Sequence, residues 1–331
     1  MSDKSKLALA IQIVLGLLLI AAIVWYIGLH DISQVFFGIN GIFLIYASIA
    51  YFIVNLLFSI RLKHVVKASR YKVSLRKVLP IQYGGMLASD FTPARSGYFV
   101  VPVMLTSENV PVTVGLSSIL GIQSIEFLIK MIGGILAIVF LISMVNLSMD
   151  LFVLSAIGVT LMFIGAVIIF LVMWWKNAVD LIKFFERFPV INRIVGFITP
   201  KILKFQKEAR NIRSVIMPIL LLTILSWIFK GLEWYFIGLS LNIDQISFLG
   251  FFLLHPLITA LSFVPITPSG IGFQEGATVG VLYLLGVSPD VGIVFALLAR
   301  FLLIIQDVVG IPSLSRAGVK IFDFISSGKT D

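Results

Sequence analysis

Long apolar runs alternate with short charged segments along most of this chain. A helix needs about 20 mostly apolar residues to cross the hydrocarbon core of a bilayer. Runs such as residues 7–29 and 151–175 exceed that length. The alternation therefore predicts an all-α polytopic membrane protein. Its six complete transmembrane helices are expected at residues 7–29, 41–60, 112–145, 151–175, 215–239 and 291–312.

Two further apolar segments, residues 78–105 and 247–286, are interrupted by prolines and glycines. The first is short for two full crossings. We predict that each forms a re-entrant helical hairpin, because irregular backbone is tolerated at membrane depth only inside protein or beside a water-filled cavity. An ordinary pair of complete spans is the alternative.

The composition agrees with a membrane protein, since 59% of the residues are hydrophobic and only 12% are charged. The chain has no cysteine, which excludes disulfides, thiolate metal sites and a cysteine nucleophile. The net charge of +9 does not indicate a nucleic-acid partner, because the basic residues follow the expected membrane topology.

Most Lys and Arg residues fall in four segments, near residues 4–6, 61–77, 176–213 and 316–329. Lys and Arg are concentrated in cytoplasmic loops of membrane proteins, so both termini are predicted to be cytoplasmic. The protein itself is predicted to lie in the cell membrane. The first hairpin would then enter from the cytoplasm and the second from outside. Residues 201–213 resemble an interfacial amphipathic helix, with a solvated linker as the alternative.

The two hairpins share a motif. Residues 92–98 read TPARSGY and residues 267–273 read TPSGIGF, and both follow the pattern Thr-Pro-x-x-x-Gly-aromatic. Further prolines flank the two motifs in the same order. We interpret this as an inverted repeat, with chance as the alternative. The whole chain, residues 1–331, would be one membrane domain: repeat 1 at about 41–145, a cytoplasmic loop at about 176–213 and repeat 2 at about 215–312.

The two breaks carry the candidate chemistry. In the first, Pro93 ends one half-helix, Gly97 lets the backbone turn, and Arg95 lies between them. A guanidinium at a broken helix end suits bidentate binding of phosphate or carboxylate, although it could also reach up to the headgroups. The second break contains a group of helix-breaking and polar residues, namely Pro268, Gly270, Gly272, Gln274 and Glu275. Glu275 either caps the next helix, pairs with Arg95 or meets a cationic substrate group.

Four cations lie outside the basic segments: Arg95, Lys130, Lys230 and Arg300. Charged residues at membrane depth are functional-site candidates. We expect Arg300 to pair with Glu126, its counterpart in the other repeat. The alternatives are local pairs, Glu126 with Lys130 and Lys230 with Glu233.

Three other polar residues lie in apolar surroundings. Asp307 could pair with Lys230 or Arg300, or lie near the cytoplasmic interface. Asp90, just before the first break, could cap backbone N–H groups or accept from Arg95. His255 precedes Pro256 and suggests a helix kink with a hydrogen-bonded imidazole rather than a proton relay.

Motifs for nucleotide binding, serine hydrolysis and zinc hydrolysis are absent, and three scattered histidines do not form a convincing metal site. We therefore expect no catalytic residues, no metal and no cofactor.

The run FVPITPSGIGFQEG at residues 263–276, followed by ARFL at 299–302, resembles the transmembrane domain of the lysylphosphatidylglycerol synthase family, also called flippase-like domain proteins. The resemblance covers roughly residues 7–315. In the first half, Arg95 and Gly97 match the family's Pro-Gly-Arg-x-Gly-Glu element, but Tyr98 stands where the family has its acid. Glu126 matches a family glutamate, whereas Phe127 and Lys130 replace the Arg and Asp that usually follow.

The resemblance implies movement of lipids between leaflets. The soluble domain that makes aminoacyl lipids in the full-length synthases has no counterpart in this sequence, so synthase activity is not expected. We predict a lipid flippase or scramblase-like transporter whose partners are membrane lipids with an anionic or polyisoprenyl-linked headgroup, with substrate contacts from Arg95, Glu275, Gln274, Arg300 and Glu126. The alternatives are a membrane enzyme acting on lipid-linked sugar or aminoacyl lipid, and a scaffold for a glycosyltransferase or another lipid-modifying partner.

Overall fold

The computed structural model describes residues 18, 20–22, 24–92, 95–144, 149–175, 206–207, 209–262 and 270–326. These residues form helices joined by short connections, and none of them forms a strand. The all-α prediction is confirmed. The prolines of both break motifs, Pro93 and Pro268, lie outside the described residues, as does most of the central loop.

Four helices are long and apolar enough to cross a membrane: Gly41–Ala68, Val112–Met144, Ala209–Ser240 and Pro289–Gly318. They contain α3 (Gly41–Ala68), α6 (Val112–Met144), α10 (Ile216–Ser240) and α13 (Pro289–Asp307). Their outward side chains are large and apolar, for example Ile45, Val139 and Leu221, each more than half exposed. Such a surface fits lipid and does not fit water. The protein is therefore a multi-pass integral membrane protein.

Two other predicted spans take a less simple form. Helix α7 (Met149–Trp174) is apolar and packs along α6. Near the N-terminus, helix Ile20–Ile27 meets α2 (Leu29–Phe37) at an angle of 87°. Gly28 makes this bend with a φ of 100°, which favours glycine. If the bent pair counts as one span, up to five helices pass the length and composition test. The total of six spans stays a prediction.

Both interrupted segments consist of short helices on either side of a break. The first contains α4 (Leu75–Asp90), the 3₁₀ turn η1 (Ser96–Val100), α5 (Val101–Leu105) and the 3₁₀ turn η2 (Thr106–Glu108). The second contains α11 (Phe248–Ser262) and α12 (Phe273–Leu284). Even α4, with 16 residues, is only about 24 Å long, less than the roughly 30 Å of the hydrocarbon core. None of these helices can cross a bilayer alone.

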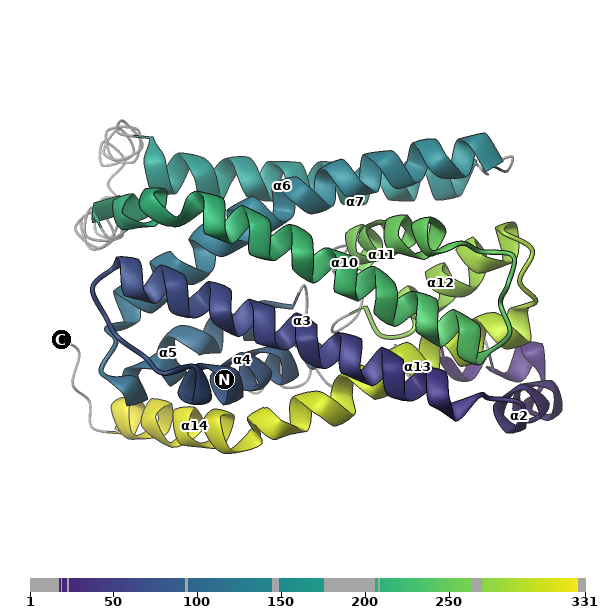
Figure 1. Cartoon of the computed structure of the whole chain (residues 1–331), viewed down its shortest axis with the longest axis horizontal. Coiled ribbons are helices and arrows are strands. Elements are labelled where there is room, and N and C mark those ends of the chain that lie inside the picture. The colour runs from purple at the N-terminus through teal and green to yellow at the C-terminus, as the bar shows by residue number, and fades with distance from the viewer. Residues whose placement is uncertain are drawn as a thin grey trace.

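The two interrupted segments lie toward opposite ends of the long helices. Figure 1 shows α4 and α5 in one half of the molecule, beside α14 (Ile311–Ser326), and α11 and α12 in the other half. Depth and direction relative to a membrane stay predictions.

The packing of the two halves is reciprocal. Each half runs long helix, short helix, break, short helix, long helix. The first long helices, α3 and α10, pack against each other. Helix α4 contacts α3 in its own half and crosses α13 and α14 of the other, while α11 contacts α10 and crosses α6 of the other half. A duplicated chain with a two-fold relation between its copies would pack in this way, although the duplication itself stays a prediction.

Two apolar cores follow from this packing. One joins the first interrupted segment to neighbouring helices, with buried side chains such as Leu62, Val78 and Met104. The other surrounds the second segment and includes Trp234 and Phe251. The polar cavity described below has residues of both halves in its wall.

Backbones approach most closely where α4 crosses the turn after α13. A Cβ added to Gly310 would lie 1.9 Å from the backbone nitrogen of Gly84. No side chain larger than hydrogen fits there without separating the two segments.

We predict that Gly310→Ala lowers the free energy of unfolding by about 1–3 kcal/mol or more, because overpacking a tight crossing forces backbone shifts. Gly318→Ala is the matched control, since a Cβ there meets nothing within 4 Å. Thermal unfolding of the purified variants in detergent measures both. Equal melting temperatures for the two variants would contradict the close crossing.

Candidate functional site

A cavity lies where the two halves meet. The empty space between its walls is about 1730 Å³, and this volume counts the part that is open to the outside. Its wall is built from α3, α4, α6, α7, α10, α11, α12 and α13, together with the first break. All five side chains predicted to contact substrate line it: Arg95, Glu126, Gln274, Glu275 and Arg300. The structure thus brings these residues into one cavity wall, although they are up to about 200 residues apart along the chain, and their contact with a substrate stays a prediction.

The first break presents Arg95 to this cavity. Arg95 has a φ of 56°, in the left-handed region that non-glycine residues rarely occupy. The Gly97 N–H donates to the Thr92 hydroxyl oxygen over 2.6 Å. A Cβ on Gly97 would lie 2.2 Å from the carbonyl oxygen of Ala88. Gly97 is therefore needed for a close backbone approach, and the residue of this break with a left-handed backbone is Arg95.

The second break is shaped by glycine conformation. Gly270 and Gly272 have φ values of 69° and 79°. The Gly272 N–H donates to Oε2 of Glu275 over 2.7 Å, so Glu275 caps the start of α12. Capping was one of the roles predicted for Glu275. The other carboxylate oxygen of Glu275 accepts from Nε of Arg300. One side chain thus joins the break to α13.

Glu126 lies at the centre of a second charge cluster, on α6. Its carboxylate accepts from Nη2 of Arg61 over 2.9 Å and pairs with Nζ of Lys130 over 2.7 Å. Nη1 of Arg61 donates to the Thr223 hydroxyl of α10 over 2.8 Å. The cluster therefore links α3, α6 and α10. The local Glu126–Lys130 pair, one of the predicted alternatives, is confirmed.

Lys230 on α10 forms the other predicted local pair, with Glu233 at 2.7 Å. Its ammonium also lies 4.5 Å from the centre of the Tyr51 ring, which allows a cation–π attraction. The Tyr51 hydroxyl donates to both carboxylate oxygens of Asp307, over 2.9 and 3.0 Å.

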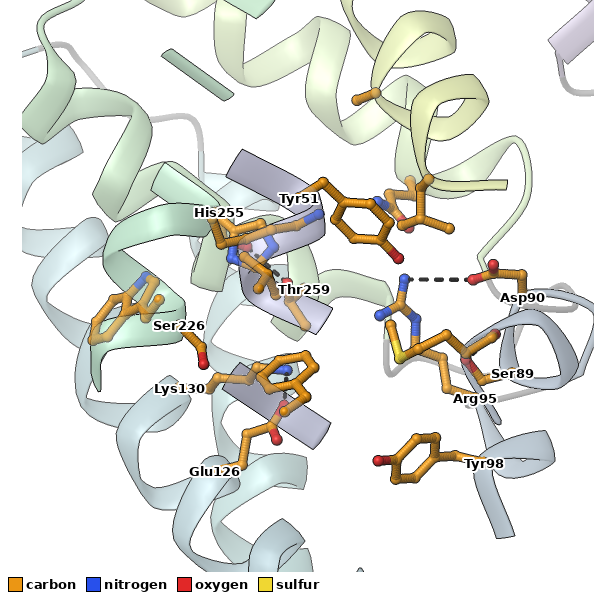
Figure 2. A pocket seen from close by; sticks show the side chains of 18 of the residues that line it. Tyr51, Ser89, Asp90, Arg95, Tyr98, Glu126, Lys130, Ser226, His255 and Thr259 are labelled. Carbon is orange, nitrogen blue, oxygen red and sulfur yellow. Dashed lines mark hydrogen bonds and ion pairs between the residues drawn. The ribbon is translucent and has the colours of Figure 1, made fainter. Parts of the chain in front are cut away.

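Asp90 is buried at the end of α4. Its nearest basic atom is Nη2 of Arg95, at 4.0 Å. Neither carboxylate oxygen of Asp90 has a hydrogen bond. Figure 2 shows Tyr51, Asp90 and Arg95 gathered on one side of the cavity, with Glu126 and Lys130 on another.

Two predicted pairings of Arg300 and Glu275 were wrong. Arg300 pairs with Glu275 and not with Glu126, because α12 packs directly on α13 while Arg61 and Lys130 occupy Glu126. Glu275 consequently does not pair with Arg95, whose ion pair is with Asp90.

Asp307 forms a hydrogen bond with Tyr51 rather than an ion pair with Lys230 or Arg300, and it is fully buried rather than at the interface. His255 lies in an unbroken α11 with Pro256 beside it, and its Nδ1 has no hydrogen-bond partner.

Sequence reasoning missed Arg61. It was assigned to a cytoplasmic basic segment, yet it is only 1% exposed and lines the cavity. Helix α3 continues to Ala68, eight residues beyond the predicted end. The apolar pattern around Arg61, with buried Leu62, Val65 and Val66, was the signal that could have revealed this.

Several guanidinium N–H groups at the cavity are unpaired. Nε of Arg61, Nε of Arg95 and Nη2 of Arg300 are buried and have no hydrogen-bond partner among the residues that the structure describes. Buried donors are normally satisfied, so each of these needs an explanation. Among the described residues, no three His, Asp or Glu side chains come together in a way that could hold a metal ion.

The sequence was compared with known protein families. The profile of the family described as "Lysylphosphatidylglycerol synthase TM region" matches residues 13–310. The chain belongs to this lysylphosphatidylglycerol synthase transmembrane-region family.

Two proteins of Methanocaldococcus jannaschii are similar to this family member. The UPF0104 membrane protein MJ1595 is 23% identical over 307 residues, which cover 88% of this chain and 89% of the relative. The UPF0104 membrane protein MJ1078 is 35% identical over 106 residues, which cover 31% of this chain and 43% of the relative. No solved structure matches.

Two of the departures from the family motifs, Tyr98 and Lys130, can now be placed in the structure. Tyr98, at the position of the family's acid, donates its hydroxyl to Oε1 of Gln82 over 2.6 Å, which joins the first break to α4. Lys130 pairs with Glu126. Both replacements therefore form polar contacts within the wall of the cavity.

Proposed function

We propose that the protein moves lipids with an anionic phosphate headgroup between the two leaflets of the cell membrane, as a flippase or scramblase-like transporter. The observation that carries this proposal is the set of unpaired guanidinium N–H groups on Arg61, Arg95 and Arg300. Guanidinium groups bind phosphate oxygens in a bidentate manner. A phosphate group in the cavity would supply the missing acceptors.

The position of the cavity supports transport rather than simple lipid binding. Arg61, Glu126 and Lys230 lie well inside helices long enough to span a membrane. Two interrupted segments from opposite halves also contribute to the wall, with Arg95 from one and Glu275 from the other. Transporters with inverted repeats bind substrate near the midplane, between interrupted helices. We infer that both segments are re-entrant hairpins and that the two halves form such a repeat.

In this mechanism the headgroup enters the cavity while the tails remain among the lipids. The headgroup phosphate contacts Arg95 first, because that side chain is the most exposed of the cavity's ion-paired cations. The pairs Glu275–Arg300 and Glu126–Arg61 then form or release as the two halves rock against each other. We propose no covalent chemistry, since transport requires only binding and rearrangement.

A vesicle assay tests the function. Purified protein is reconstituted with a fluorescent phosphatidylglycerol or with fluorescent glucosylceramide, which has no phosphate and no charge. A membrane-impermeant quencher is added outside, and the initial rate at which inner-leaflet probe moves to the outer leaflet and is quenched is measured. We expect the protein to accelerate movement of the phosphatidylglycerol, relative to protein-free vesicles, and not of the glucosylceramide. Equal acceleration of both probes, or of neither, would contradict recognition of an anionic headgroup.

A further inference from the structure

The charged groups around the cavity balance. Five cations line it: Arg61, Arg95, Lys130, Lys230 and Arg300. Three acids line it and two more bind lining residues, giving five: Asp90, Glu126, Glu275, Glu233 and Asp307. With these ten groups ionised and His255 neutral, the sum is zero.

An anionic headgroup disturbs this balance. One added negative charge leaves the cavity with a net charge of −1, and an uncompensated charge removed from water costs several kcal/mol. Binding is much easier if one of the five acids becomes protonated at the same time. The geometry identifies which acids are suited to this.

Three of the five acids have close cations. Glu126 has Arg61 and Lys130 within 2.9 Å, and Glu233 has Lys230 at 2.7 Å. Glu275 is paired with Arg300. Charge-assisted hydrogen bonds of this kind favour the ionised carboxylate.

The other two acids lack such partners. Asp90 is 2% exposed and lines the cavity, and neither of its carboxylate oxygens has a hydrogen bond from a described residue; Arg95 is 4.0 Å away. Asp307 is fully buried, and within the described part of the chain its hydrogen-bond donor is the Tyr51 hydroxyl. The two carboxyl groups also lie within interaction range of each other. Two adjacent carboxylates disfavour double ionisation.

The backbone holds the two acids together. Asp90 ends α4 and Asp307 ends α13. Helix α4 contacts α13 and also the turn after it, which crosses α4 at Gly84 and Gly310. The fold therefore holds together the helices that carry the two carboxyl groups.

We propose that Asp90 and Asp307 form a proton-binding pair that takes up one proton when an anionic headgroup occupies the cavity and releases it when the headgroup leaves. The inference rests on the proposed function and adds its energy coupling. Headgroup and proton would move together without net charge, so a proton gradient could drive the lipid in one direction.

The coupling runs through Arg95. The pair faces Arg95 from the first break, Tyr51 from α3, Tyr83 from α4, Lys230 from α10 and Arg300 from α13. When a phosphate pairs with the Arg95 guanidinium, the attraction between Asp90 and Arg95 is weakened. Asp90 then binds a proton from water more readily. The effect is reciprocal, so a proton on the pair frees Arg95 and strengthens anion binding.

Calorimetric titration with dihexanoylphosphatidylglycerol tests the proposal in detergent. This phosphodiester keeps one negative charge across the pH range used, so proton uptake must come from the protein. Titration in buffers of different ionisation enthalpy measures the uptake. Above the pH at which the empty pair loses its second proton, we expect about one proton taken up per probe bound by the wild type, and an affinity that falls about tenfold per pH unit.

Asp307→Asn should strengthen probe binding at alkaline pH, whereas a variant that damages the site should weaken it. It gives the empty cavity a charge of +1, so it should bind the probe without proton uptake, with little pH dependence, and more tightly than the wild type at alkaline pH. Asp90→Asn should do the same and serves if Asp307→Asn does not fold. Glu108→Gln is the control, because Glu108 pairs with the exposed Lys77 outside the cavity and should leave uptake unchanged.

The outcomes separate the two ideas. Probe binding by the wild type without proton uptake overturns the inference and leaves the proposed function standing. Uptake that persists in both asparagine variants places the proton elsewhere, for example on His255, and also overturns the inference. No binding by the wild type at any pH overturns the proposed function and, with it, the coupling.

Discussion

Replacing Glu126 with leucine is expected to lower the free energy of unfolding by about 3–5 kcal/mol, because it leaves the buried charge of Arg61 without a counter-charge. Arg61 is 1% exposed, and Glu126 is the one acid that pairs with it in the described part of the chain. The Thr223 hydroxyl and the Phe58 ring remain beside Arg61, but neither carries a negative charge. Lys130 loses its partner in the same step. Thermal and denaturant unfolding in detergent would measure the loss.

A triple variant separates structure from function. Arg61→Met, Glu126→Leu and Lys130→Met together remove all three charges, and replacing buried ionic groups with apolar side chains of similar size is often neutral or stabilising. We expect stability to return and lipid movement to stay lost. Glu108→Gln breaks the exposed pair with Lys77 and should lower stability by no more than about 1 kcal/mol. A single Glu126→Leu variant as stable as the wild type would show that the cluster is not compensating a buried charge.

The helical membrane fold could be predicted because its signals are local. A run of about 20 apolar residues is sufficient evidence for a spanning helix, and α3, α6 and α10 occupy the predicted segments. The boundaries were less certain. Helix α3 continues through Arg61 to Ala68 because Leu62, Val65 and Val66 pack in the core beyond the predicted end. A basic residue there was mistaken for the start of a loop.

The residues beside the breaks and the two local ion pairs, Glu126–Lys130 and Lys230–Glu233, were also predictable, but the pairings between helices were not. Glycine and proline act on the backbone around them, so both breaks could be located from sequence, and the residues beside the breaks line the cavity. Ion pairs depend on which helices pack together. Arg300 pairs with Glu275 because α12 packs on α13. Spacing along the chain does not reveal this tertiary contact.

The placement of Asp90 and Asp307 illustrates the same limit more strongly. The two residues are 217 positions apart in the sequence, and the crossing of α4 with the turn after α13 brings together the helices that carry them. Reciprocal packing of the two halves therefore does more than stabilise the fold. It places acids of one half among cations of both, so that movement of either half changes the pairing of charges in the cavity.

Arg95→Ala is expected to reduce the initial rate of anionic lipid movement about 10–100-fold, because a charge-assisted hydrogen bond contributes about 1.5–3 kcal/mol. Its effect on stability should be small. The Arg95 side chain is 28% exposed and its ion pair with Asp90 is long, at 4.0 Å. The reconstituted leaflet assay with fluorescent phosphatidylglycerol measures the rate, and thermal unfolding checks the fold.

Two companion variants decide how Arg95 acts. Arg95→Lys keeps the positive charge and loses the planar fork, so a partial rate would indicate bidentate binding of phosphate, while a full rate would indicate charge alone. Glu275→Gln keeps an acceptor for the Gly272 N–H and removes the charge opposite Arg300. If Glu275 exchanges partners during transport, this variant should also slow lipid movement while remaining folded. Wild-type rates in both Arg95→Ala and Glu275→Gln would remove the proposed site, because the two broken segments would then contribute nothing to moving the headgroup.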